Sequence, residues 1–158
     1  MKKLVLLGLF VAGLVACNNM NSTHEKKGPE DIGGKGDSNT VASYDPNRGE
    51  GKFTSVEVSA TLDAAKAGSG EKVYSVKCSA CHKLTGEKLV GPGWKGVTGR
   101  HTAAWIMNFA TNPDEMINKD PKAQAMLEIC LVRMPNQNLT GEDARNIYEF
   151  MRKNDGVK

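Results

Sequence analysis

Cys78-Ser79-Ala80-Cys81-His82 places two thiols three residues apart, followed directly by an imidazole. Two such thiols can add to the two vinyl groups of a haem, and the adjacent histidine is then delivered to the iron as an axial ligand. The spacing therefore predicts one covalently attached haem c. Two alternatives use the same pair of cysteines, namely a redox-active dithiol and half of a zinc site.

The N-terminal residues predict export and attachment to a membrane. Two lysines precede an apolar run over residues 4–15, which is shorter than the roughly 20 residues of a membrane-spanning helix. We interpret residues 1–16 as a signal peptide. It ends in Leu14-Val15-Ala16-Cys17, which is similar to the bacterial lipobox, so Cys17 is expected to be lipidated and to anchor the protein in the cell envelope, on the periplasmic side. The alternative is an ordinary signal peptide with an accidental cysteine.

The charge balance argues against a nucleic-acid-binding protein, and each of the four cysteines has an expected role. The chain has 21 basic and 18 acidic residues, and removal of the two signal-peptide lysines leaves 19 against 18, so nucleic acid is not an expected partner. Of the four cysteines, Cys17 is expected to carry lipid, and Cys78 and Cys81 are expected to be bonded to haem. The remaining one, Cys130, is expected to be a small buried apolar side chain. A reactive thiol or an intermolecular bridge is the alternative for Cys130.

Composition divides the exported chain into two parts. From Asn18 to about Ser55 the sequence is rich in Asn, Ser, Gly, Lys and Asp and poor in large apolar residues, so it cannot bury a core. We therefore expect residues 17–60 to be the lipidated cysteine and a flexible linker. Residues 61–158 suit one compact domain, which we expect to be monomeric.

The domain is expected to be all-α, with three to five short helices around one haem, because no convincing alternating strand pattern is present. Helices are expected over residues 69–80, from Thr102 to Asn112, and after Asp120 and Thr140. Thr102 and Asp120 suit N-caps, Pro121 follows Asp120 at the first helical position, and Thr140 begins a capping-box-like sequence.

Over roughly residues 62–156 the chain resembles a class I bacterial cytochrome c. The matched features, in the order of that family, are Cys78-Ser79-Ala80-Cys81-His82, Gly91-Pro92-Gly93-Trp94-Lys95-Gly96, Gly99-Arg100, Met134-Pro135 and an amphipathic C-terminal helix. The resemblance implies the cytochrome c fold, in which the first and last helices cross near a glycine and an aromatic residue. Here these would be Gly70 and Tyr74, against Ile147 and Phe150.

The resemblance also implies contacts to the haem. The carbonyl of Pro92 would accept a hydrogen bond from His82, which orients the ring and raises its basicity as a ligand. Arg100 would contact a haem propionate, and Trp94 would pack on the haem. Trp105 could donate its indole N–H to a propionate, although an aromatic residue on an apolar helix face is more often part of the core.

The sixth ligand of the iron decides between an electron carrier and a catalyst. Four of the five methionines in the domain lie at helical spacing or at helix ends, where packing is the ordinary role. Met134 lies instead in an irregular segment before Pro135, where a loop can cross the open haem face. We therefore predict ligation by His82 and Met134, with His101 or a vacant position as alternatives.

With both axial positions held by protein, the expected function is one-electron transfer, without catalysis. The alternative is a haem enzyme or gas sensor, peroxidase-like or binding NO or CO, with a labile or absent sixth ligand. By analogy with the family, the redox partners would be a quinol-oxidising complex upstream and a terminal oxidase or nitrogen-oxide reductase downstream.

Overall fold

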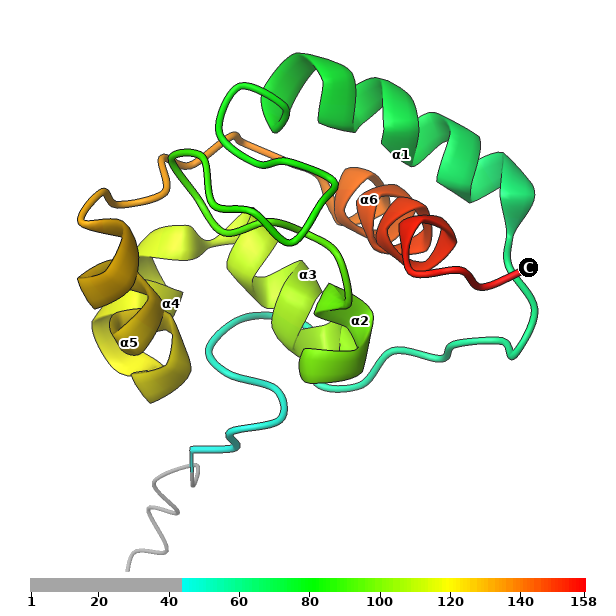
Figure 1. Ribbon diagram of the computed structural model, residues 1–158. Coiled ribbons are helices and arrows are strands. Elements are labelled where there is room, and N and C mark those ends of the chain that lie inside the picture. The colour runs from blue at the N-terminus through cyan, green and yellow to red at the C-terminus, as the bar shows by residue number, and fades with distance from the viewer. Residues whose placement is uncertain (1–43) are drawn as a thin grey trace, which may run out of the picture. The chain divides into compact units, whose positions relative to one another are not determined.

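The computed structural model describes residues 44–158, which contain six α-helices and no strand, only one isolated bridge between His82 and Lys88. The helices are α1 (Ala64–Lys77), α2 (Val97–Arg100), α3 (Ala103–Thr111), α4 (Pro113–Lys119), α5 (Pro121–Cys130) and α6 (Gly141–Asn154). Figure 1 shows α1 crossing α6, with α3 beneath them and α4 and α5 to one side. The predicted all-α class is confirmed, with one helix more than the expected upper number. The short helices α2 and α4 were not predicted.

Side-chain caps determine where the helices begin. Thr102 accepts a hydrogen bond from the N–H of Trp105 at the start of α3, and Asp120 accepts one from Ala123 at the start of α5. Thr140 and Asp143 form a reciprocal capping box at the start of α6. These three helix starts are confirmed, because each cap satisfies an N–H that the first turn of a helix leaves unpaired.

The first helix differs from its predicted range of residues 69–80. It begins five residues earlier, at Ala64, because Asp63 accepts a hydrogen bond from the N–H of Lys66 and so caps the helix. It also ends earlier, at Lys77, so that Cys78 is its C-cap. The motif of the two cysteines and the histidine therefore follows α1 as a turn, instead of lying inside the helix.

Helices α1 and α6 approach most closely at Gly70. A methyl group at this position would overlap the backbone carbonyl of Asn146 and would lie 2.9 Å from the nitrogen of Ile147. The ring centroids of Tyr74 and Phe150 are 5.3 Å apart along the same interface. The expected crossing of the first and last helices is therefore present, and it needs a residue without a side chain at Gly70.

Residues 44–62 lie against the helices, which corrects the predicted extent of the flexible linker. The buried side chain of Asn108 donates to the carbonyl oxygens of Arg48 and Phe53 and accepts from the N–H of Phe53. Arg152 donates to the carbonyl of Ser59 at 2.6 Å. Composition suggested a linker here because the segment has little apolar surface of its own, but its backbone is paired by side chains of α3 and α6.

The predictions for the signal peptide and for Cys17 concern residues outside the described part of the chain. Among residues 44–158, none of the helices has the length and the apolar character required to cross a bilayer.

Replacement of Gly70 by alanine is predicted to destabilise the domain by about 1–3 kcal/mol, because the added methyl group meets backbone atoms that cannot move aside. Gly68→Ala is the matched control in the same helix, because nothing lies within 4 Å of the added methyl group. The control is expected to stabilise the domain by about 0.5–1 kcal/mol through helix propensity. Denaturant unfolding of the two variants measures both effects, and equal stabilities would contradict the proposed crossing.

Candidate haem site

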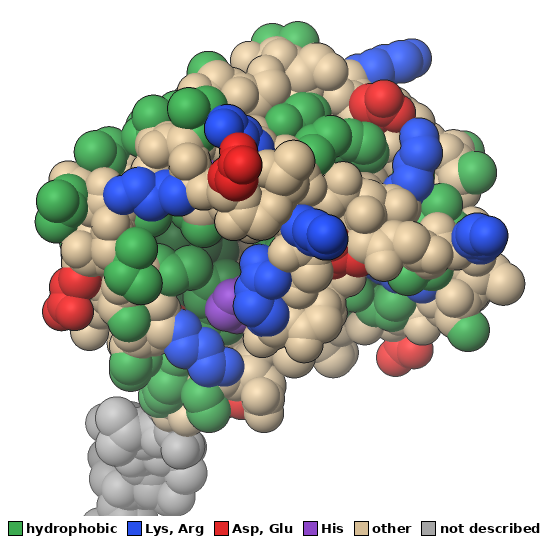
Figure 2. Space-filling model, in the orientation of Figure 1, with side chains coloured by type: hydrophobic (Ala, Val, Ile, Leu, Met, Phe, Trp, Pro, Cys, Tyr) green, Lys and Arg blue, Asp and Glu red, His purple; other side chains and the backbone are tan. Residues whose placement is uncertain are grey.

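A cavity of about 430 Å³ lies between the segment that joins α1 to α2, the helices α3, α5 and α6, and the segment that joins α5 to α6. Its walls are mainly hydrophobic, and Figure 2 shows a hollow of such side chains surrounded by lysine and arginine. Cys78, Cys81, His82 and Met134 all line it. The cavity therefore brings together the predicted attachment residues and the predicted sixth ligand.

The two cysteines and the histidine are held in a single turn at the end of α1. The N–H groups of Cys81 and His82 both donate to the carbonyl of Cys78, at 3.0 and 2.9 Å. This turn places both thiols and the imidazole on the wall of one cavity. Thioether attachment and axial ligation to one haem need this arrangement.

The environment of the cysteines does not favour the two alternative uses of the motif. Burial raises the pKa of Cys78 to about 11, so its thiol is protonated near neutral pH, whereas dithiol redox centres rely on a lowered thiol pKa. No group of three or more His, Cys, Asp or Glu side chains within residues 44–158 is arranged to hold a metal ion. Neither a reactive dithiol nor a zinc site is supported by these residues.

The hydrogen bond expected between His82 and Pro92 is present, with 2.8 Å between Nδ1 of His82 and the carbonyl oxygen of Pro92. A carbonyl only accepts, so Nδ1 carries the proton and Nε2 keeps its lone pair for a metal. Burial lowers the pKa of His82, which favours the neutral ring that ligation requires. The hydroxyl of Tyr74 also donates to the backbone carbonyl of His82, at 2.8 Å, and so ties the histidine to α1.

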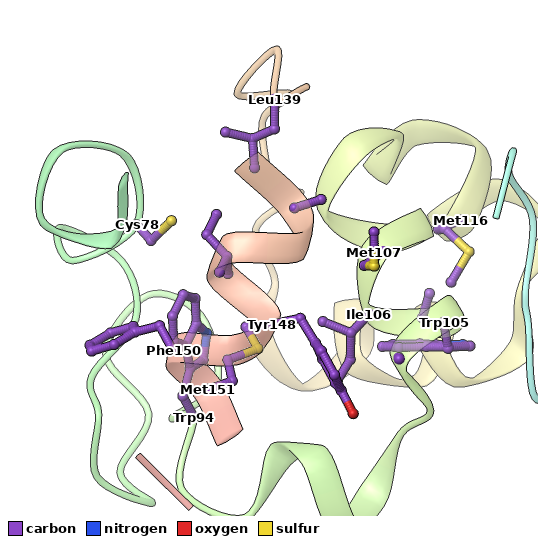
Figure 3. Close-up of a cluster of buried hydrophobic side chains, with 14 of the residues drawn as sticks. Cys78, Trp94, Trp105, Ile106, Met107, Met116, Leu139, Tyr148, Phe150 and Met151 are labelled. Carbon is purple, nitrogen blue, oxygen red and sulfur yellow. The ribbon is translucent and has the colours of Figure 1, made fainter. Parts of the chain in front are cut away.

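Trp94 is buried next to this histidine, with its ring centroid 5.6 Å from that of His82 and 4.9 Å from that of Tyr74. Figure 3 shows Trp94, Phe150 and Met151 gathered near one end of α6. Trp94 also lines the cavity. Gly91 lies beside the imidazole, because a methyl group there would collide with the ring of His82.

On the other side of the cavity, Met134 is half-buried and lies in the segment between α5 and α6. Two other methionines, Met126 and Met151, line the same cavity, as does Cys130. The expectation that Met126 is simply a core residue was incomplete, since it is half-buried and faces the cavity. Cys130 is likewise only partly buried, because it lies at the end of α5 and not in the interior.

Arg100 and Trp105, the two residues predicted to contact a haem propionate, have different hydrogen-bond partners in the structure. Arg100 is exposed on the cavity wall and donates to the carbonyl of Lys95 at 2.8 Å. Trp105 also lines the cavity, but its indole N–H donates to the buried carboxylate of Asp120 at 2.9 Å. The suggested hydrogen bond from Trp105 to a propionate is therefore corrected. The donor has a protein partner, and Trp105 packs in the core.

Two features of the site were not found from the sequence. His101 stacks on Trp105, with 3.9 Å between ring centroids, and Tyr44 donates its hydroxyl to the carboxylate of Asp120. The sequence predicts His101 as an alternative iron ligand or as a loop residue near the haem edge, and Tyr44 lies in the predicted linker. The position of Arg100 and His101 directly before the helix cap Thr102 could have indicated that His101 lies near the start of α3. No pattern in the sequence indicates that Tyr44 pairs with Asp120, which is 76 positions away.

Comparison with known proteins agrees with this geometry. The family model described as cytochrome c matches residues 67–155. The solved structure of cytochrome c from Rhodothermus marinus has 33% identity and a TM-score of 0.64, covering 66% of this chain and 90% of that chain. An engineered cytochrome c from the same organism, bound to a carbene intermediate, has 32% identity and a TM-score of 0.61, with the same coverage.

A curated relative, the cytochrome c-type cyt cy of Rhodobacter capsulatus, is 44% identical over 48 residues. That match covers 30% of this chain and 24% of the relative, so it spans about a quarter of the relative's length. The fold and the cavity define a cytochrome domain of the c type. The chain belongs to the cytochrome c family, whose members are electron carriers with covalently bound haem c.

The residues of the cavity fit one haem c. Two thiols and a neutral imidazole with a free Nε2 meet on an apolar wall, and a methyl group at Gly91 would displace that imidazole. When bound, the haem supplies an iron that changes between the ferric and ferrous states.

Gly91→Ala is predicted to reduce the yield of haem-loaded protein and to destabilise that protein by about 1–3 kcal/mol, because the methyl group pushes the ring of His82 out of place. Gly86→Ala, in the same segment, is the control, because nothing lies within 4 Å of its added methyl group. Haem content after denaturation and thermal unfolding give the two readouts. Parent-like behaviour of Gly91→Ala would show that this glycine does not position the histidine.

Proposed function

We propose that this protein is a monohaem electron carrier in which Cys78 and Cys81 hold the haem, while His82 and Met134 ligate its iron. The observation that carries the proposal is that one apolar cavity is lined by both thiols, by His82 with Nε2 available, and by Met134 on the segment between α5 and α6. If His82 and Met134 both bind the iron, no coordination position would be open to a substrate, so we propose a carrier and not an enzyme.

The residues around the cavity support electron transfer in separate ways. Tyr74 and Pro92 hold His82 in one orientation, which would keep this ligand in place in both oxidation states. The apolar walls would keep water from a bound haem and so reduce the solvent rearrangement that accompanies a change of charge. A thioether ligand from Met134 stabilises the ferrous state and raises the reduction potential relative to a second imidazole.

The alternative is a haem enzyme or gas sensor in which the sixth ligand is labile or absent. Two further methionines, Met126 and Met151, and also Cys130 line the cavity. Their sulfur atoms could therefore compete with Met134 for the sixth position on the iron. A low-spin ferric spectrum with a sulfur-to-iron charge-transfer band supports the carrier. A high-spin spectrum with rapid binding of carbon monoxide supports the alternative.

Met134→Ala is predicted to keep the covalent haem but to lose the sulfur charge-transfer band and to bind external ligands. Its potential is expected to fall by on the order of 0.1–0.3 V, within the span of about 0.8 V that axial ligands cover. Absorption spectra and redox titration measure these changes.

Two matched variants accompany this test. Met107→Leu alters a buried methionine outside the cavity and is expected to leave the spectrum unchanged, at less than about 1.5 kcal/mol of stability. Met126→Leu alters a methionine of the cavity that we do not assign to the iron. Loss of the charge-transfer band in Met126→Leu, but not in Met134→Ala, would refute the assignment of the sixth ligand.

We further propose that Cys17 carries lipid after removal of residues 1–16, and that the domain works at a membrane of the bacterial cell envelope. This proposal is supported by the lipobox-like sequence before Cys17. Its partners would be membrane-associated respiratory complexes, with a quinol-oxidising complex as donor and a terminal oxidase or nitrogen-oxide reductase as acceptor. The carrier itself would act as a monomer.

Cys17→Ser is predicted to release a soluble, red and redox-competent protein, because the acylated residue is lost while the haem site is untouched. The measurement is the share of haem in the membrane and soluble fractions after a high-salt wash. A variant that stays with the membrane would show that another anchor exists.

A further inference from the structure

Residues 44–53, called the leading segment below, are fastened to α3 before the chain reaches α1. In Figure 1 this segment is the cyan trace that runs beneath α3. The buried side chain of Asn108 in α3 makes hydrogen bonds of 2.9–3.0 Å to the backbone of Arg48 and Phe53. A methyl group at Gly51 would overlap this side chain, so the backbone lies directly against it.

The carboxylate of Asp120 joins the leading segment to two helices. Asp120 is completely buried at the start of α5. Its Oδ2 atom accepts hydrogen bonds from the hydroxyl of Tyr44 and from the indole N–H of Trp105 in α3, and its Oδ1 atom accepts one from the N–H of Ala123. A buried carboxylate needs such donors because it has lost its water. Tyr44 therefore helps to hold the start of α5 against α3.

Two further contacts fasten the leading segment to α4 and α5. The backbone N–H of Glu50 donates to the sulfur of Met116, a completely buried residue of α4, at 3.0 Å. The ammonium group of Lys122 in α5 donates to the carbonyl of Pro46 at 2.7 Å. The leading segment therefore contacts both helices of the α4–α5 pair.

The α4–α5 pair in turn holds the residues around Met134. Helix α5 ends at Cys130, shortly before Met134 in the chain. Arg133, directly before Met134, donates to the side-chain oxygen of Asn118 in α4 at 3.0 Å and lies 3.5 Å from the carboxylate of Asp114. A shift of α4 and α5 would therefore move Met134 relative to the opposite wall of the cavity.

The histidine side of the cavity depends on different contacts. His82 is held by the carbonyl of Pro92 and by the hydroxyl of Tyr74 in α1. Neither of these hydrogen bonds involves residues 44–53. Loosening the leading segment should therefore affect the Met134 side and leave the histidine and the two attachment cysteines in place.

We propose that Tyr44 is a positioning residue for the sixth iron ligand, and that the leading segment acts through Asp120 to keep Met134 on the iron. The proposal rests on the ligation by Met134 proposed above. States with Met134 bound and released are in equilibrium, and a hydrogen bond that is intact only when α5 packs on α3 favours the bound state. Linkage makes the effect reciprocal, so release of Met134 weakens the bond between Tyr44 and Asp120.

The test is binding of imidazole to the ferric, haem-loaded Tyr44→Phe variant at neutral pH. Imidazole competes with Met134 for the iron, so its apparent affinity reports the fraction of molecules in which Met134 is released. Loss of one hydrogen bond to Asp120 is expected to raise this affinity by about threefold to tenfold. Tyr148→Phe is the matched control, because it removes the hydroxyl of a buried tyrosine of α6 that does not line the cavity. Its affinity should equal that of the parent.

Gly49→Ala tests the leading segment at a second position. Gly49 has a φ of 66°, and an added methyl group would lie 2.6 Å from the sulfur of Met116 and 3.1 Å from Oδ2 of Asp120. The segment should move away from α4 and α5, so imidazole should again bind more tightly. Gly156→Ala is the control for backbone strain, because its φ is 94° but nothing lies within 4 Å of the added methyl group. It should bind imidazole as the parent does.

A purely structural role of Tyr44 would lower the unfolding temperature of Tyr44→Phe but leave its imidazole affinity at the parent value, and this result would overturn the proposal. An equal rise in affinity in Tyr148→Phe or Gly156→Ala would also overturn it, because the effect would not depend on the contact with Asp120. Failure of the Met134 assignment would look different, since the parent itself would lack the sulfur charge-transfer band before imidazole is added.

Discussion

The hydrogen bond between His82 and the carbonyl of Pro92 is the interaction on which the haem site depends. It fixes the protonated nitrogen of the ring and leaves Nε2 available as a metal ligand. The segment between α1 and α2 must fold back on itself to make this bond, and it can do so because Gly91 leaves room beside the ring. Tyr74 links the same histidine to α1, so the ligand is held from two sides.

The helix pair α1 and α6 gives this site a rigid base. The crossing at Gly70 holds the end of α1, and with it both cysteines, at a constant position relative to α6. Buried Glu149 of α6 pairs with Arg152, and Arg152 also donates to backbone carbonyls of the segment before α1. Packing and a small buried polar network therefore act together to hold α1, α6 and the segment before α1 in place.

Local chemistry explains which features could be predicted from the sequence. The attachment motif, the caps at Thr102, Asp120 and Thr140, and the irregular segment around Met134 are each defined by neighbouring residues. The paired backbone of residues 44–60 and the partner of Trp105 were missed, because both depend on side chains distant in the chain. The two unpredicted helices, α2 and α4, have four and seven residues, too few to show a periodic pattern.

We propose that the apolar cavity holds an iron between the imidazole of His82 and the thioether of Met134. X-ray absorption at the iron edge of the ferric, haem-loaded protein tests this most directly, because it distinguishes sulfur from nitrogen and oxygen in the first coordination sphere. One sulfur and five nitrogen ligands are expected in the parent, with the sulfur absent from Met134→Ala. A parent spectrum without sulfur, or a sulfur that persists in Met134→Ala, would contradict it.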